Sequence, residues 1–217
     1  MTAETDDTRQ RILNAAFKAF SEKGFAGAST LSIATRAKVS KRDLYALFPN
    51  KEAMLLACIT DRSELMRMPE GLAEPEDRRM LASTLEAFAA NFLAESLHPD
   101  AVGTFRLAIA EVVRSPQVAQ MLEEAREGLR GILYGLFVRA QGNGLLPSGD
   151  TAEMVRKFYA LAWEDLLLSL LLGVQTPPSR PHIQRHACKA VADFLLIYPQ
   201  PEATPPLHPQ HGADHHG

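Results

Sequence analysis

Apolar residues recur at steps of three and four along almost the whole 217-residue chain, and no convincing stretch alternates apolar with polar residues. That spacing places apolar side chains on one face of an α-helix, whereas a half-buried β-strand needs a period of two. Ala, Leu, Glu and Arg, which are good helix formers, dominate these stretches. The sequence therefore predicts an all-α fold.

Prolines, glycines and capping residues divide the chain into nine predicted helices. These run from residues 6–8 to 24, then over 31–37, 41–47, 51–68, 75–97, 101–114, 116–141, 150–172 and 181–198. We expect three parts: an N-terminal three-helix domain (1–50), a larger helical domain (51–198) and a disordered tail rich in Pro and His (199–217).

The charge balance differs between the two ends of the chain. The net charge is −3, but residues 1–55 carry a net charge of +3 and the remainder −6. A basic N-terminal region followed by an acidic remainder is consistent with a local binding site for a polyanion. An excess of three charges also arises by chance, so charge alone does not decide the function.

The sequence predicts a soluble, cytoplasmic protein. Cys58 and Cys188 lie far apart without C-x-x-C spacing, which favours two buried thiols in a reducing compartment. The polar start MTAETDDTRQ does not have the pattern of a signal peptide. The longest apolar run, 166–174, is well short of the ~20 residues that a membrane span needs.

The second and third predicted helices form a helix-turn-helix pattern. A tight turn joins them, and Ala34, Val39 and Leu44 stand where they can make one small core. Ser40 is placed to cap the third helix, with Asp43 three residues later in a capping-box spacing. In this motif the later helix enters the DNA major groove.

The third helix presents basic and aromatic side chains outward. With Leu44 facing inward, Lys41 and Arg42 can reach guanine acceptors or phosphate, and Tyr45 can reach a phosphate, a sugar or a thymine methyl. Lys51 begins the next helix, where backbone N–H groups favour a phosphate. Each residue taken singly is an ordinary solvated side chain. Together on one short helix they favour a polyanion site.

This stretch resembles the tetracycline-repressor (TetR) family of bacterial transcriptional regulators. The similarity is carried by "RILNAAFKAFSEKGFAGAST" (11–30) and "IATRAKVSKRDLYALFPNKEAML" (33–55), and it is specific over residues 9–57. Beyond that it is architectural. The resemblance implies a homodimeric repressor that binds a double-stranded DNA operator and is released by a small-molecule effector. It places the DNA contacts at Thr30, Ser40, Lys41, Arg42, Tyr45 and Lys51.

Three departures from the family pattern concern this motif. Lys38 holds the turn position usually occupied by glycine, and a left-handed lysine costs roughly 1 kcal/mol unless a phosphate contact offsets it. Asp43 replaces a small hydroxyl residue, and its capping role is the simpler explanation of this replacement. Ala46 and Leu47 stand where an aromatic residue or histidine is usual at one or both positions. These departures concern which bases are contacted.

The larger domain offers a set of apolar side chains that either line an effector cavity or belong to an ordinary core. By the resemblance, its last two helices (150–172 and 181–198) would form a four-helix bundle with a second subunit. The segment 162–173 is apolar on nearly all sides, which also favours a dimer interface. Glu111 is either a polar group in the cavity or, as we prefer, a partly exposed acid. The candidate cavity residues are Phe88, Phe92, Phe105, Ile109, Val112, Met121, Phe137 and Trp163.

No motif predicts an enzyme, a metal site or a cofactor. There is no set of nucleophile, base and orienting group, and no glycine-rich phosphate loop. His182 and His186 lack an evident third ligand, and the histidines of the tail are a weaker metal candidate. Two alternatives stay open: a helical small-molecule-binding protein, and a DNA-binding protein without sequence preference.

Overall fold

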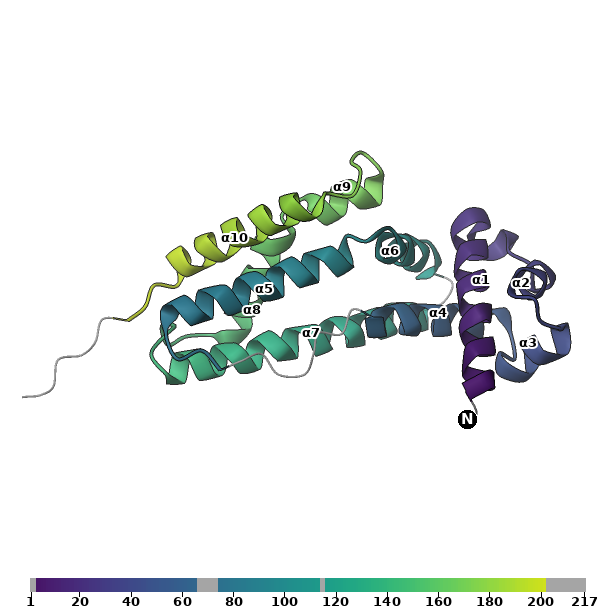
Figure 1. The fold of residues 1–217 in the computed structure, drawn as a ribbon, viewed down its shortest axis with the longest axis horizontal. Coiled ribbons are helices and arrows are strands. Elements are labelled where there is room, and N and C mark those ends of the chain that lie inside the picture. The colour runs from purple at the N-terminus through teal and green to yellow at the C-terminus, as the bar shows by residue number, and fades with distance from the viewer. Residues whose placement is uncertain (1–2, 66–73, 114–115, 202–217) are drawn as a thin grey trace, which may run out of the picture.

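The computed structural model describes residues 3–65, 74–113 and 116–201, and within these ranges the chain forms ten α-helices and no β-strand (Figure 1). The all-α prediction is confirmed. None of the described helices is both long and apolar enough to cross a membrane. The helices are α1 (Ala3–Gly27), α2 (Thr30–Ala37), α3 (Lys41–Leu47), α4 (Lys51–Leu65), α5 (Arg78–Ser96), α6 (Pro99–Glu111), α7 (Pro116–Gly142), α8 (Thr151–Trp163), α9 (Leu166–Leu172) and α10 (Arg180–Ile197).

The molecule is elongated, with α2 and α3 at one end beyond α1 and the helices α5 to α10 extending toward the other (Figure 1). A first core cluster joins α1, α2, α3 and α4, and Ile12, Ile33 and Leu44 within it are fully buried. Leu107 and Ala108 of α6 belong to the same cluster. The N-terminal helices are therefore packed directly onto the larger domain.

A second core cluster holds the larger domain together. Its centre is a set of buried phenylalanines from four helices. The Phe194 ring of α10 lies 5.1 Å from the Phe137 ring of α7 and 5.3 Å from the Phe158 ring of α8. Phe88 of α5 lies 6.1 Å from Phe158. Aromatic pairs at these separations add to the free energy gained by burying their area.

The helix α4 lies between the two clusters. Met54, Leu55, Cys58 and Ile59 are buried in the first cluster, and α4 also packs against α6 and α7. The predicted boundary at residue 50 separates α4 from α1, α2 and α3, although these helices share one core cluster. The domain limits 1–50 and 51–198 remain a prediction.

The predicted stop of the first helix at Gly24 is confirmed as a kink, and one further helical turn follows it to Gly27. Gly24 adopts φ 68° and ψ 168°, which only glycine adopts readily, so the chain kinks there. Hydrogen bonding then resumes, since the N–H of Ala28 donates to the Gly24 carbonyl at 3.2 Å. The glycine therefore bends the helix, which ends at Gly27.

The predicted single helix over 150–172 is wrong, because the chain breaks between α8 and α9. Glu164 has φ 45° and ψ −123°, outside the helical region. The break lets α9 pack beside α6, where Arg106 donates to the carbonyls of Leu170 (2.6 Å) and Leu171 (3.0 Å). Tertiary packing thus redirects a segment whose local sequence favours one continuous helix.

Capping residues account for two smaller differences at helix starts. The helix α5 begins at Arg78 because Asp77 caps it, accepting from the Met80 N–H at 2.7 Å. The helix α6 begins at Pro99, which occupies the first turn where proline is favoured. The predicted helix ends at 68 and 114, and the predicted disordered tail from 202 onward, lie outside the described residues.

Arg78 joins three segments of the larger domain. Its guanidinium donates to the carbonyl of Leu145 in the α7–α8 loop and to the carbonyls of Leu195 (2.9 Å) and Tyr198 at the end of α10. These carbonyls include acceptors at a helix C-terminus, where a cation is favoured. Burial lowers the pKa of Arg78, but the guanidinium stays charged.

Replacing Arg78 by Met should lower the free energy of unfolding by about 1.5–3 kcal/mol, because three carbonyls lose a charged donor. Thermal unfolding followed by circular dichroism measures the effect. The exposed neighbour Arg79 provides the control, since Arg79→Met should change stability by no more than about 0.5 kcal/mol. Equal melting temperatures for the two variants would show that Arg78 does not stabilise the larger domain.

Candidate nucleic-acid interface

The helices α2 and α3 form a helix-turn-helix held by a left-handed lysine. Lys38 has φ 56° and ψ 45°, as its place at the usual glycine position predicts. Its N–H donates to Thr35 O at 3.2 Å, and the Val39 N–H donates to Ala34 O at 3.0 Å. These bonds satisfy carbonyls at the end of α2. The turn is therefore well bonded, at a backbone cost of about 1 kcal/mol.

Local capping and burial stabilise the short helix α3. The Ser40 hydroxyl accepts from the Asp43 N–H at 3.1 Å and donates to the Asp43 carboxylate at 2.7 Å, so the predicted capping pair is confirmed. Leu44 is fully buried and Phe48 is nearly so. At seven residues the helix is too short to be stable alone. Its position is thus set by the core beneath it.

The opposite side of α3 is exposed and carries the predicted DNA-contact residues. Lys41, Arg42 and Tyr45 all lie at the surface, and the Tyr45 side chain is 45% exposed. The Tyr45 hydroxyl lies 3.1 Å from the hydroxyl of Thr30, the first residue of α2. The structure therefore brings the predicted residues of α2 and α3 together. Their contact with DNA remains a prediction.

Lys51 differs from these residues because its ammonium points inward. It donates to the carbonyls of Phe25 (2.7 Å) and Ala28 (3.2 Å), between α1 and α2, and lies 4.4 Å from the centre of the Phe25 ring. These contacts tie the start of α4 to the end of α1. A phosphate contact by Lys51 stays a prediction, and it requires the ammonium to leave these carbonyls.

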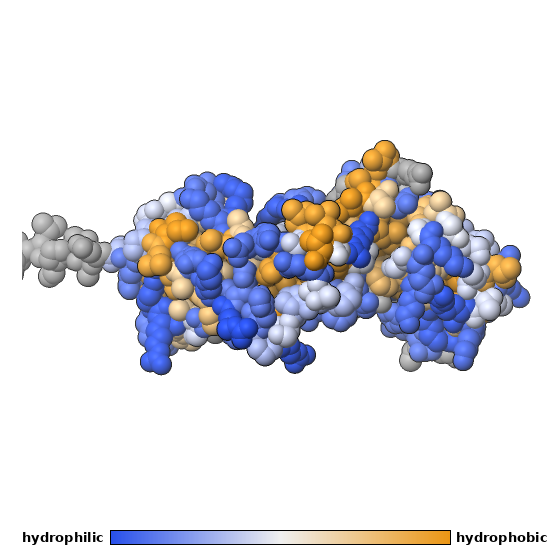
Figure 2. Space-filling model, turned by 90° about the horizontal axis from the view of Figure 1, so that it is seen from above, coloured by the Kyte–Doolittle hydropathy of each residue, from blue (hydrophilic) through white to orange (hydrophobic). Residues whose placement is uncertain are grey.

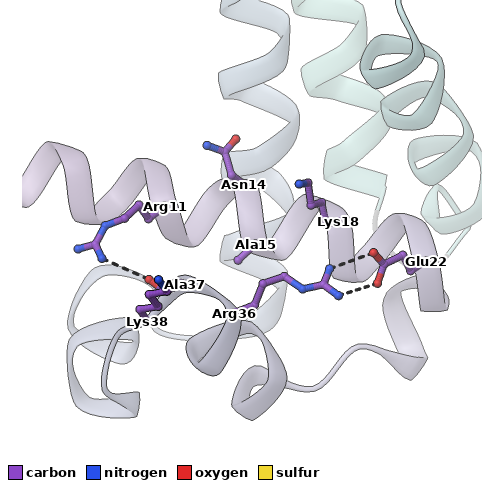
Figure 3. A pocket seen from close by; sticks show the side chains of 8 residues that line it. All are labelled: Arg11, Asn14, Ala15, Lys18, Glu22, Arg36, Ala37 and Lys38. Atoms are coloured by element: carbon purple, nitrogen blue, oxygen red, sulfur yellow. Dashed lines mark hydrogen bonds and ion pairs between the residues drawn. The ribbon is translucent and has the colours of Figure 1, made fainter.

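A groove between α1 and α2 was missed by the sequence analysis. It has a volume of about 580 Å³ and is lined by basic side chains with one acid. Figure 3 shows the Arg36 guanidinium paired with both oxygens of Glu22, at 3.1 and 2.8 Å. Arg11 donates to Ala37 O at 3.4 Å. The lining residues are Arg11, Asn14, Ala15, Lys18, Glu22, Arg36, Ala37 and Lys38.

The predicted cavity residues of the larger domain form an aromatic group only in part. The Phe92 ring lies 5.4 Å from Trp163 and 4.9 Å from Tyr159, which sequence reasoning missed. The Trp163 indole donates to the Ser96 hydroxyl at 3.4 Å, and the Tyr159 hydroxyl donates to Leu129 O at 3.0 Å. Burial raises the pKa of Tyr159. The group thus combines apolar rings with polar atoms.

The other candidate cavity residues are dispersed. Phe88 touches the aromatic group, with its ring 6.3 Å from Phe92, whereas Phe137 lies deeper in the core beside Phe194. Phe105 is half-buried on α6, and Ile109 is 61% exposed. Val112, just after α6, is half-buried, and the Met121 side chain lies outside the described residues. Effector contact by any of these residues remains a prediction.

The preferred interpretation of Glu111 as a partly exposed acid is wrong. The residue is only 4% exposed. It ends α6, which packs among α1, α4, α7 and α9, so its carboxylate is enclosed by neighbouring helices. Its position between Ala110 and Val112 on a mostly apolar helix is what left a polar group in the cavity as the alternative.

Comparisons with known proteins agree with this architecture. The model of the bacterial regulatory proteins of the tetR family matches residues 12–58, and the C-terminal domain of AefR-like transcriptional repressors matches residues 83–200. The HTH-type transcriptional regulator UidR of Escherichia coli K12 is 32% identical over 193 residues, which are 86% of this chain and 89% of UidR. The chain belongs to the TetR family. It is therefore a DNA-binding transcriptional regulator, from a family whose members are not enzymes.

Solved structures of TetR proteins share the whole fold. A TetR regulator from Agrobacterium tumefaciens superposes with a TM-score of 0.75 at 29% identity, covering 88% of this chain and 94% of that one. The flavonoid-responsive regulator FrrA gives a TM-score of 0.71 at 28% identity, covering 90% and 98%. The similarity thus extends through both core clusters.

Replacing Lys51 by Met should lower the free energy of unfolding by about 1–2 kcal/mol, because two carbonyls lose a charged donor and the Phe25 ring loses its cation. Thermal unfolding tests this prediction. Lys41→Met is the matched control, since Lys41 is exposed on α3 and its removal should change stability by no more than about 0.5 kcal/mol. A Lys51→Met protein as stable as the control would contradict a structural role for the ammonium.

Proposed function

We propose that this TetR protein is a homodimeric repressor that binds a double-stranded DNA operator and is released by a small, largely apolar effector. The observation that carries the DNA part is the capped helix α3, with Lys41, Arg42 and Tyr45 exposed on it and Tyr45 bonded to Thr30. The N-terminal residues of such a helix lie near base edges in the major groove. The proposed DNA contacts are Thr30, Ser40, Lys41, Arg42, Tyr45 and Lys51.

Each contact has a chemical role. Arg42 presents two parallel N–H donors to guanine, Lys41 a point charge to guanine or phosphate, and Tyr45 a hydroxyl or ring to the backbone or to thymine. The hydrogen bond between the Thr30 and Tyr45 hydroxyls holds the Tyr45 hydroxyl in place, which reduces the entropy lost on binding. The Ser40 hydroxyl donates its proton to the Asp43 carboxylate and accepts the Asp43 N–H, so one lone pair remains to accept from a donor on the DNA.

The surface of the larger domain supports a dimer. Figure 2, which looks onto the side where α9 and α10 lie, shows apolar side chains exposed among hydrophilic ones. Leu196 of α10 is 78% exposed, and Leu168 and Leu172 of α9 are more than half exposed. A two-fold dimer through the segments 150–172 and 181–198, which contain α8, α9 and α10, would cover such side chains and supply two copies of α3 for two half-sites.

The aromatic group supports an effector site in the larger domain. Phe92, Tyr159 and Trp163 offer ring faces, and the Ser96 hydroxyl offers a polar atom beside them. A pocket opened beside these residues would suit small, mostly apolar ligands with a few polar groups. The similarity to a regulator described as flavonoid-responsive favours a planar aromatic compound.

The coupling between effector and DNA would pass through α4 and α6. Both helices contribute to the first core cluster and also pack against α7 of the larger domain. On α6, a Cβ atom added to Gly103 would lie 3.2 Å from the Phe17 ring of α1, so the two helices are in close contact. An effector that favours a different spacing of the two α3 helices would then shift the population away from the DNA-bound state.

The fragment upstream of the protein's own gene should bind more tightly than a scrambled duplex, and Tyr45→Ala should remove most of this preference. Fluorescence anisotropy over a salt series measures both affinities. Tyr134→Ala is the matched control, because Tyr134 is similarly exposed on α7 and should leave binding unchanged. Equal affinity for the two duplexes would contradict sequence-specific regulation by this fragment and favour a general DNA-binding protein.

Replacing Leu196 by Glu should shift the protein from dimer to monomer, because a charge would be buried at the proposed interface. Sedimentation equilibrium gives the dissociation constant, which should rise at least tenfold. Val113→Glu is the control, since Val113 is exposed on the chain after α6. If Leu196→Glu dimerises as tightly as the control, α10 does not form the interface.

A further inference from the structure

Lys38 keeps a backbone conformation that suits glycine better than lysine. Within the described residues, only Lys38 and Glu164 have a positive φ without being glycine. Lys38 lies in the left-handed region, which costs an L-residue energy that glycine avoids. Strained positions of this kind persist where the surrounding structure holds them in place, and they cluster at functional sites. The turn alone therefore does not explain why lysine, and not glycine, occupies this position.

The side chain stands at one end of the groove between α1 and α2 (Figure 3). Two of the basic groups in the groove are already neutralised, since Arg36 pairs with Glu22 at 2.8 Å and Arg11 with Asp7 at 3.1 Å. Arg36 holds the pKa of Glu22 below its ordinary value, so this acid stays ionised and paired. The groove therefore has little negative charge left to repel an anion.

Lys38 supplies an uncompensated positive charge, and Lys18 supplies a second ammonium, which lies near enough to Glu22 to help lower the pKa of that acid. Across the residues that the structure describes, neither ammonium forms a salt bridge or a side-chain hydrogen bond, and both side chains are exposed. An exposed ammonium without a partner is available to a phosphate oxygen. That phosphate must lie within reach when DNA is bound to α3.

The position of Lys38 in the chain places its side chain close to DNA bound to α3. It stands three residues before Lys41, so their Cα atoms are at most about 11 Å apart. Phosphates follow one another every 3.4 Å along the axis of each DNA strand. A strand that passes Lys41 therefore presents neighbouring phosphates within reach of the flexible Lys38 side chain.

We propose that the groove between α1 and α2 is a second phosphate-binding surface, in which Lys38 binds the backbone of the DNA duplex beside the bases that α3 contacts. This inference rests on the proposed DNA binding and extends it to a residue outside the recognition helix. The ligand is the phosphodiester backbone, so the contribution is the same for every base sequence. It raises affinity and salt dependence without changing sequence preference.

The size of the effect follows from counterion release. Each phosphate that a lysine neutralises contributes about 0.9 to the slope of log affinity against log salt concentration. Two subunits that each lose one contact would lower the slope by about 1.8. If the affinities converge at 1 M salt, binding at 0.1 M salt would be up to about 60-fold weaker.

The decisive variant is Lys38→Gly, because it removes the charge and also relieves the backbone. Its melting temperature should equal or exceed that of the unmodified protein, so weaker binding would not reflect unfolding. Lys38→Arg keeps the charge and should retain the salt slope. Arg79→Ala removes one charge at the start of α5, far from α3, and should leave DNA binding unchanged (Figure 1).

The experiment measures anisotropy over a salt series with two duplexes, the fragment upstream of the protein's own gene and its scrambled form. Lys38→Gly should weaken binding to both by the same factor and lower both slopes by about 1.8. If its affinities and slopes match those of the unmodified protein, the inference is overturned while the proposed function stands. If the unmodified protein does not discriminate between the duplexes, sequence-specific function on this fragment is overturned, while lower slopes for Lys38→Gly still support the phosphate contact. Absence of DNA binding by the unmodified protein overturns both.

Discussion

The burial of Leu44 in the first core cluster is the interaction on which the DNA-binding surface depends. A seven-residue helix does not form stably in water, so α3 exists because Leu44 and Phe48 enter the first core cluster. Complete burial of one leucine contributes about 1.5–3 kcal/mol. The Ser40 cap and the left-handed Lys38 turn then fix where the helix begins. The buried side of α3, its cap and the turn before it thus set the position of its exposed side.

The same core also connects the DNA-binding end to the rest of the molecule. It contains Leu107 and Ala108 of α6 and several residues of α4. The DNA-binding helices and the larger domain therefore share one apolar core. On the far side, Arg106 of α6 holds the carbonyls of Leu170 and Leu171, which links α6 to α9. A displacement of α9 would therefore act on α6, and through the contact at Gly103 on α1. Closely packed helices transmit such shifts because they cannot deform gradually.

Features fixed by local sequence could be predicted, whereas features fixed by tertiary contact could not. The cap at Ser40, the left-handed turn at Lys38 and the inward face of α3 depend on residues a few positions apart, and the structure confirms them. The break at Glu164 could not be predicted, because the segment has no proline or glycine there and packing on α6 decides it. The inward contacts of Lys51 require the position of carbonyls more than 20 residues away. The groove escaped notice for the same reason, since its charges come from two helices.

Pairing within the fold, rather than net charge, determines which cations remain for DNA. Residues 1–55 carry nine basic side chains, which by count alone form only a weak excess. Arg11 and Arg36 are held by acids, and the Lys51 ammonium by carbonyls that it must leave before it can bind a phosphate. Lys38, Lys41 and Arg42, which lie within five residues of one another, are exposed. Besides Lys18 of α1, which is also exposed, the positive charge that is free to meet a polyanion therefore lies at the turn and the first residues of α3, where the motif places the duplex.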